Sequence, residues 1–186
     1  PKGMGEVTLK TQPRRRLKPI RLEKFGNIKE IGGISVCTFL ADRKVALRQA
    51  KEAERLLKIR GYDPDIRVVN DFSNPIQKGS SLVLWAKTDS GILLGSDAIG
   101  ELRKPSEAVA REATKNLLDE IQARATADIH LADMLIPYVS LSEGESTYLT
   151  RLITDHIESN MWLVSEILGV SFEVKKHDSL VGITKK

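Results

Sequence analysis

The sequence contains one cysteine, Cys37, in 186 residues, which excludes an internal disulfide and a cysteine-based zinc site. Its longest strongly apolar run, residues 82–86, is far shorter than the roughly 20 residues of a membrane-spanning helix. The sequence shows no Ser-His-Asp order, no His-Glu-x-x-His motif and no Rossmann glycine fingerprint. The loop at residues 79–81 lacks the Gly-Lys-Ser/Thr ending of a Walker A loop. We therefore expect none of these catalytic or nucleotide-binding frameworks, no dedicated metal site and no membrane partner.

The remaining composition, with 41% hydrophobic and 29% charged residues, is typical of a soluble globular protein. A chain of this length forms one large domain or two small ones, and it buries a sizeable core without a disulfide or a metal. The chain begins at Pro1, with neither an initiator Met nor a signal-peptide pattern. These features predict a cytoplasmic protein whose chain starts partway through a domain.

The formal net charge of +4 is small, but basic residues gather near the start of the chain. Residues 10–24 contain a single acid, Glu23, and this basic set: Lys10, Arg14, Arg15, Arg16, Lys18, Arg21 and Lys24. Such a run is either a solvated linker or a strip that contacts nucleic-acid phosphates, because clustered Arg and Lys release counterions from a polyanion. No aromatic residue is interleaved before Phe25, so we expect no base-stacking platform here. The consecutive arginines at 14–16 are the candidates for phosphate contact.

Hydrophobic periodicity before residue 128 predicts the order β-α-β-β-β-α, preceded by a short strand at residues 7–9. The first long strand is expected to be interrupted at Gly32-Gly33. Stripes of small and apolar residues at helical spacing mark the two helices. The predicted elements are strands near 28–39, 65–69, 81–87 and 91–95, and helices over 42–60 and from 106 onward.

From residue 128 the pattern changes to a mostly apolar helix over 128–141, which Pro137 should kink or shorten. The elements after it are a strand near 147–150, a helix over 155–168, and strands near 170–174 and 179–184. Two units therefore follow one another with a boundary near 126–128, and the short first strand is a candidate member of the second unit. The predicted fold class is α+β, in the form of an α/β sandwich.

His156 has surroundings that suit covalent chemistry. Asp155 with Glu158 three residues later fits a capping box, which would place His156 at the first helical position. Free backbone N–H groups and the positive end of the helix dipole disfavour an imidazolium there, and they can hold a phosphate. A neutral imidazole is what a nucleophile requires. The alternative is an exposed or capping histidine without a catalytic task.

His130 and Asp133 lie three residues apart on the predicted 128–141 helix and therefore share one face. As metal ligands they form a set of only two, so they do not make a protein-only metal site. The imidazole could stack on a base, beside a carboxylate that polarises it or contacts a magnesium ion carried by a nucleotide. The alternative is a polar patch at the junction of the two units.

Taken together, the segments resemble the RNA 3'-terminal phosphate cyclase family, and its archaeal members most. Family members share a His/Tyr-x-Ala-Asp helix, a histidine before Thr-Asn, an apolar helix and a Val-x-Phe-x-Val strand. The resemblance covers essentially the whole chain in order, through residues 1–5 (PKGMG), 79–86 (GSSLVLWA), 95–101 (GSDAIGE), 130–137 (HLADMLIP), His156-x-x-Ser159-Asn160 and 166–174 (EILGVSFEV).

This resemblance implies a large domain of repeated β-α-β-α-β-β units, like a domain of a translation initiation factor, that carries a smaller α/β insert domain. By this likeness residues 25–127 form the insert. Residues 1–24, a strand with the basic linker, and residues 128–186, a C-terminal repeat, belong to the large catalytic domain.

The activity that the resemblance implies is ATP-dependent conversion of an RNA 3'-phosphate end to a 2',3'-cyclic phosphate, a ligase-type reaction. His156 matches the nucleophile that attacks the ATP α-phosphate and becomes a covalent histidine–AMP intermediate. His130, Asp133 and Met134 match positions that line the adenylate pocket, with His130 as the base-stacking partner. The implied ligands are ATP with a divalent metal ion, Mg²⁺ or Mn²⁺, and RNA with a 3'-phosphate end.

The sequence departs from the family pattern in three places. Met134 stands where many cyclases have glutamine, Met4 interrupts a glycine triplet, and Ser159 replaces threonine. The resemblance also begins partway through the family pattern, and the missing N-terminal half carries the family's phosphate-binding arginines. We therefore expect that this chain alone does not cyclise RNA. The alternatives are a non-catalytic cyclase-like factor of ribosome biogenesis, whose members lack the histidine at position 156, and a plain α/β interaction domain.

Overall fold

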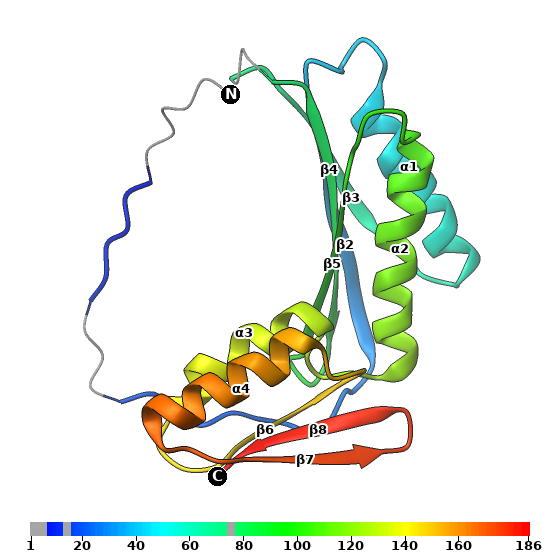
Figure 1. Ribbon diagram of the computed structural model, residues 1–186. Helices are drawn as coiled ribbons and strands as arrows, with labels where there is room; N and C mark the ends of the chain where they lie inside the picture. The colour runs from blue at the N-terminus through cyan, green and yellow to red at the C-terminus, as the bar shows by residue number, and fades with distance from the viewer. Residues whose placement is uncertain (1–6, 13–15, 74–76) are drawn as a thin grey trace.

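The computed structural model describes residues 7–12, 16–73 and 77–186, which form two four-stranded sheets and four helices (Figure 1). Each sheet has its own hydrophobic core of buried side chains. The predicted α+β fold class is therefore confirmed. Over the ranges just given, no helix is both long enough and apolar enough to cross a membrane.

The first sheet carries two helices on the same face (Figure 1). Its strand order is β3-β2-β4-β5, in which β2 and β3 are parallel and the other neighbours are antiparallel. Along the chain the order is β-α-β-β-β-α, as the periodicity predicts. The elements are β2 (Ile28–Thr38), α1 (Val45–Ile59), β3 (Asp65–Asp71), β4 (Gly79–Thr88), β5 (Leu93–Ile99) and α2 (Ser106–Ala123).

Stripes of small and apolar side chains form the buried faces of both helices of this unit. The stripe predicted for the first helix is the buried face of α1, and Gly61 follows the helix with a φ of +83° that favours glycine. The stripe of α2 is buried in the same way. The buried members are Ala46, Ala50, Ala53 and Leu57 in α1, and Val109, Ala113, Leu117 and Ile121 in α2.

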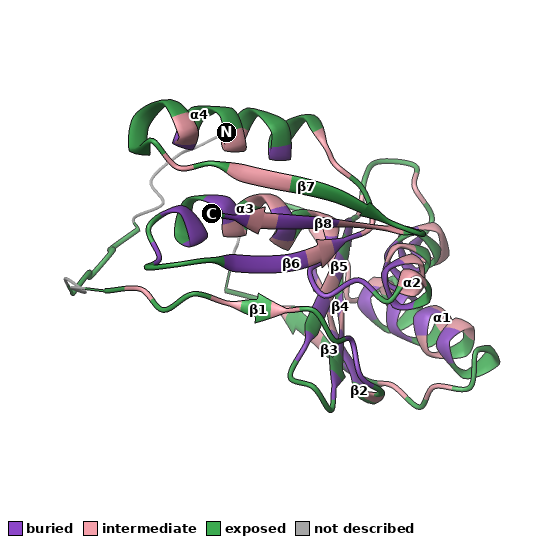
Figure 2. Ribbon diagram, turned by 90° about the horizontal axis from the view of Figure 1, so that it is seen from below, coloured by how far each residue is buried: buried purple, intermediate pink, exposed green. Residues whose placement is uncertain are grey.

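The second sheet has the strand order β1-β6-β8-β7, with α3 and α4 lying together over one of its faces (Figure 1). Along the chain its elements follow the order β-α-β-α-β-β, and the whole first sheet with its helices is inserted between the first strand and the first helix. The elements are β1 (Arg21–Leu22), α3 (Ile129–Ser140), β6 (Ser146–Thr150), α4 (Asp155–Leu168), β7 (Phe172–His177) and β8 (Leu180–Lys185). Figure 2 shows that β6 and the inner parts of both helices form the buried centre of this unit.

The strand predicted at residues 7–9 is wrong. Residues 7–12 are irregular, and the side chains of Val7 and Leu9 are 93% and 82% exposed. The first strand of the second sheet lies instead within the basic segment, where Arg21 and Leu22 pair in parallel with β6. Two alternating apolar residues are a weak signal, because a strand persists only where its backbone groups find a partner. Leu22 adds packing against both cores.

The glycine pair Gly32-Gly33 does not interrupt β2, which continues from Ile28 to Thr38. The two glycines serve close packing on opposite faces. A Cβ at Gly32 would lie 2.6 Å from the Trp85 ring, and one at Gly33 would lie 2.7 Å from Leu84 Cδ2. The pair therefore marks a close approach between strands β2 and β4, not a break.

This packing predicts a cost for any side chain at Gly33. In Gly33→Ala the new Cβ would also lie 2.8 Å from the Val83 carbonyl oxygen, a backbone atom that cannot move aside easily. We expect the free energy of unfolding to fall by about 1–3 kcal/mol, measured by urea denaturation. The control is Gly79→Ala in β4, whose Cβ meets nothing closer than Thr38 Oγ1 at 3.9 Å. Equal stabilities for the two variants would contradict this interpretation.

Candidate functional site

Helix α3 is fixed at its start by Asp128, the N-cap residue. The Asp128 carboxylate accepts hydrogen bonds at Oδ1 from the backbone N–H groups of His130 (3.1 Å) and Leu131 (2.8 Å). Its other oxygen, Oδ2, accepts from the Gly95 N–H of the edge strand β5 at 2.9 Å. One buried carboxylate therefore satisfies the free donors of a helix end and of a sheet edge together. This bond places α3 against the first sheet.

The candidate residues of α3 lie on its accessible side. His130 and Met134 are exposed, whereas Asp133 is half-buried above Tyr148 of β6. The Tyr148 hydroxyl donates to the Ala132 carbonyl at 2.6 Å. Burial raises the pKa of Tyr148 well above its usual value, and the negative charge of Asp133 raises it further. Asp133 therefore lies near a fully buried, neutral phenol.

Pro137 lies inside α3, and the helix continues past it to Ser140. Because proline has no N–H, the Asp133 carbonyl four residues earlier loses its helical donor. The side chain of Asn160 on α4 approaches that carbonyl, with Nδ2 at 3.5 Å from the oxygen, the long limit of a hydrogen bond. A proline in one helix thus frees a backbone group for a side chain of the other.

His156 is exposed in the first turn of α4, but the helix is capped differently from the predicted capping box. The N-cap is Thr154, whose Oγ1 accepts from the Ile157 N–H at 3.2 Å. Asp155 is therefore the first helical residue, and His156 is the second. The prediction was wrong by one residue because Thr154, with extended φ and ψ of −102° and 161°, is itself a good cap.

The structure brings together the candidates on α3 and α4, since these helices pack side by side and Asn160 lies one turn after His156. The basic segment is only partly described. Arg14 and Arg15 lie outside the described residues, and Arg16 is exposed and pairs with Glu143 at 3.3 Å. Within 7–12, 16–73 and 77–186, no three His, Cys, Asp or Glu residues cluster as a metal site.

A buried ion pair lies at the junction of the two units, and no pattern in the sequence predicts it. Glu120 of α2 is 2% exposed, and its Oε1 accepts from Arg151 Nε at 3.1 Å. Burial raises the pKa of the Glu120 carboxyl, while the positive charge of Arg151 opposes that rise. The second oxygen, Oε2, is buried without a partner in the described structure. Neither residue belongs to a motif, so periodicity predicts only the helix that carries Glu120.

Comparison with known proteins identifies relatives along the whole chain. Residues 23–122 match the family model described as RNA 3'-terminal phosphate cyclase (RTC), insert domain. RNA 3'-terminal phosphate cyclase of Pyrobaculum aerophilum is 40% identical over 174 residues, which is 92% of this chain and 49% of the relative. The protein of the same name from Methanopyrus kandleri is 36% identical over 179 residues, covering 94% of this chain and 51% of the relative. The chain spans about half the length of the curated relatives it matches.

The Glu120–Arg151 pair predicts a pH-dependent stability. Replacing Arg151 with methionine removes the charge that stabilises the buried carboxylate, so the pKa of Glu120 rises further above its ordinary 4.5. Between 4.5 and the raised value the folded state binds more protons than the unfolded state, so stability falls as pH rises. We expect Arg151→Met to lose about 2 kcal/mol near neutral pH, and much less at about pH 5, in urea denaturation.

The control is Arg55→Met, which breaks an exposed Arg–Glu pair on α1, with Nε–Oε2 at 2.8 Å. Arg55 is largely exposed, so its removal should cost less than about 1 kcal/mol at both pH values. A destabilisation by Arg151→Met that is the same at both pH values would show that Glu120 is not titrating in the folded protein.

Proposed function

The chain belongs to the RNA 3'-terminal phosphate cyclase family, and on that premise we propose that it forms part of an enzyme that uses ATP to convert an RNA 3'-phosphate into a 2',3'-cyclic phosphate. The observation that carries this proposal is His156, exposed in the first turn of α4 and beside α3. The histidine stands in the sequence context of the family's nucleophile.

In the proposed reaction an unprotonated nitrogen of His156 attacks the α-phosphorus of ATP. An N–P bond forms, the bond to the bridging oxygen breaks, and pyrophosphate leaves. The adenylyl group then passes to an oxygen of the RNA 3'-phosphate, which breaks the N–P bond. The neighbouring 2'-hydroxyl of the RNA attacks the phosphorus of the RNA 3'-phosphate, loses its proton and displaces AMP, which leaves the 2',3'-cyclic phosphate. The start of α4 supports the first step, because the Asp155 and His156 N–H groups face the end of the helix where a phosphate can bind.

The adenylate would lie against α3. His130 is exposed and one turn before Met134, so an imidazole and a thioether present a flat and a polarisable surface to an adenine base. Met134 offers apolar contact where glutamine would offer a hydrogen bond. Asp133, half-buried and near Tyr148, is the carboxylate available to the ribose or to a nucleotide-bound cation.

A divalent ion, Mg²⁺ or Mn²⁺, would enter with the nucleotide and neutralise the charge of the departing pyrophosphate. Asp133 is the one acidic side chain among the candidate residues, which suits an ion held mainly by phosphate oxygens. Because the chain spans about half of its relatives, we propose that activity also requires the N-terminal half of the family's length. The cytoplasmic location and the domain limits at 24/25 and 127/128 stay predictions.

The decisive test is a covalent adduct on His156. The segment of the Pyrobaculum aerophilum relative that matches this chain is replaced by the chain itself, and the chimera is incubated with ATP labelled at the α-phosphate. We expect a protein-bound AMP that acid removes and alkali does not, as a phosphoramidate behaves. His156→Ala should abolish it.

The matched control is His177→Ala, which removes the exposed histidine of β7 and should leave the adduct unchanged. All variants are first compared by thermal unfolding, so that only folded chimeras are assayed. A folded wild-type chimera without adduct, next to an active relative, would overturn the enzyme proposal in favour of a non-catalytic cyclase-like factor.

The arginines at 14–16 are proposed RNA contacts. Replacing all three with alanine removes cations that displace counterions from the RNA backbone. We expect the slope of log Kobs against log salt concentration to become shallower by about 0.7 for each RNA phosphate that is no longer neutralised, measured with single-stranded RNA. An unchanged slope would assign these residues to a solvated linker.

A further inference from the structure

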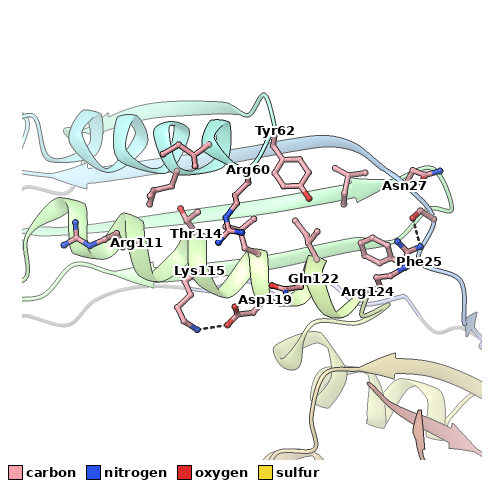
Figure 3. A pocket seen from close by; sticks show the side chains of 16 residues that line it. Phe25, Asn27, Arg60, Tyr62, Arg111, Thr114, Lys115, Asp119, Gln122 and Arg124 are labelled. Atoms are coloured by element: carbon pink, nitrogen blue, oxygen red, sulfur yellow. Dashed lines mark hydrogen bonds and ion pairs between the residues drawn. The ribbon is translucent and has the colours of Figure 1, made fainter. Parts of the chain in front are cut away.

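A cavity of about 880 Å³ lies between helices α1 and α2, on the helix-covered side of the first sheet (Figure 3). We call it the α1–α2 groove. It is formed by residues 25–28, by the last turn of α1 with Arg60 and Tyr62, and by residues of α2 from Arg111 onward with Arg124 after the helix. None of the candidate residues on α3 and α4 lines it.

The groove combines an apolar floor with an aromatic side chain. Its apolar lining residues are Leu56 and Ile59 from α1 and Leu118 and Ile121 from α2. The ring of Tyr62, which follows the end of α1, points into the space between the helices (Figure 3). A flat, partly apolar group would be desolvated here and could lie against the tyrosine ring.

The rim of the groove is cationic. Lys115 forms an ion pair with Asp119 at 2.7 Å. Arg124 donates a hydrogen bond to the Gly26 carbonyl and lies over the Phe25 ring. Arg60 extends from the end of α1 across the groove toward α2 (Figure 3), and it forms no ion pair with any residue in the described ranges.

Arg111 is only weakly paired. Its Nη1 is 3.7 Å from Glu52 Oε1, and that carboxylate is already held in a two-bond contact by Arg55 at 2.8 and 2.9 Å. Arg60 and Arg111 therefore keep donors available for an anion. Arginine is well suited to that task, because its planar fork matches phosphate oxygens.

Thr114 adds an independent observation. It is 1% exposed and lines the groove, and its hydroxyl oxygen has no hydrogen-bond partner among the described residues. A buried hydroxyl without a partner costs stability unless a bound molecule supplies one. Figure 3 shows Thr114 on the side of α2 that faces the Arg60 side chain.

We propose that the α1–α2 groove binds a short stretch of an RNA strand, with one phosphate held by Arg60, a neighbouring phosphate held by Arg111, and a base lying over the apolar floor against Tyr62. This rests on the proposed function, because it names a second contact for the same class of substrate. An inorganic anion would use the arginines but not the floor, and an apolar peptide would use the floor but not the arginines. A nucleotide uses both.

The test is fluorescence anisotropy of the 186-residue chain with a short, unstructured, labelled oligoribonucleotide, without ATP. We expect Arg60→Gln/Arg111→Gln to weaken binding at least about tenfold and to lower the salt slope by about 1.4, twice the value for one single-strand phosphate contact.

Thr114→Val should weaken binding severalfold without lowering the unfolding midpoint, because it removes an unpaired hydroxyl and keeps the shape. A loss of stability with unchanged affinity in Thr114→Val would remove that residue from the site.

The matched control is Lys51→Gln/Lys58→Gln, which makes the same charge change on exposed positions of α1 outside the groove. If it weakens binding as much as the arginine pair does, or if the arginine pair binds normally, the groove assignment is wrong. If free AMP displaces the RNA at equal nucleotide concentration, the groove binds a free nucleotide, and the proposal that it binds an RNA strand is wrong. The binding assay contains no ATP and the adduct assay contains no RNA, so failure of the groove and failure of the adenylation chemistry give different results.

Discussion

The buried hydrogen bonds of Thr126 and Asp128 hold the two sheets in one arrangement. The Thr126 hydroxyl donates to the Leu22 carbonyl at 2.5 Å and accepts from the Leu149 N–H at 2.8 Å, so it ties the segment that follows α2 to β1 and β6 of the second sheet. Asp128, two residues later, holds the Gly95 N–H of β5. Because these groups are buried, loss of one partner would leave the other unsatisfied, at about 1–3 kcal/mol each. The position of the first sheet on the second is thereby fixed by directional bonds as well as apolar contact.

The same junction sets the geometry of the candidate site. Asp128 orients the first turn of α3, and the remaining contact between α3 and α4 is mainly apolar, through fully buried side chains such as Ile136 and Ile157. The Asn160 contact at 3.5 Å is too long to carry much energy. Its value is positional, because it relates the turn of α4 that follows His156 to the turn of α3 that bears Asp133. A site assembled this way depends on helix packing, and helix packing depends on the junction.

The parts of this fold that sequence predicts are those with local signals. Helix α4 occupies the predicted residues 155–168, because a capping threonine precedes it and Gly169, with a φ of +66°, ends it. The strand at Arg21–Leu22 escapes prediction because it is two residues long, lies in a charged segment and exists only through pairing with a strand more than a hundred residues later. Gly32-Gly33 misleads in the opposite direction, since glycine marks both breaks and close approaches, and only the neighbouring Trp85 and Leu84 decide between them. For the site, sequence indicates the individual residues, whereas the Glu120–Arg151 pair and the α1–α2 groove arise from contacts that no local pattern encodes.

Charge shows the same distinction between local pattern and spatial arrangement. The net charge of +4 says little about partners, because many basic side chains in the structure are paired with acids: Arg48 with Glu107, Arg55 with Glu52 and Lys104 with Glu112. What matters for an anion is which cations keep free donors. The basic segment is conspicuous in sequence, yet Arg16 is paired with Glu143. Arg60 stands in an ordinary stretch of sequence, but folding places it over an apolar floor, opposite an unpaired hydroxyl and without an acid among the described residues. The strongest argument for phosphate recognition in the first unit therefore comes from a residue that charge counting alone passes over.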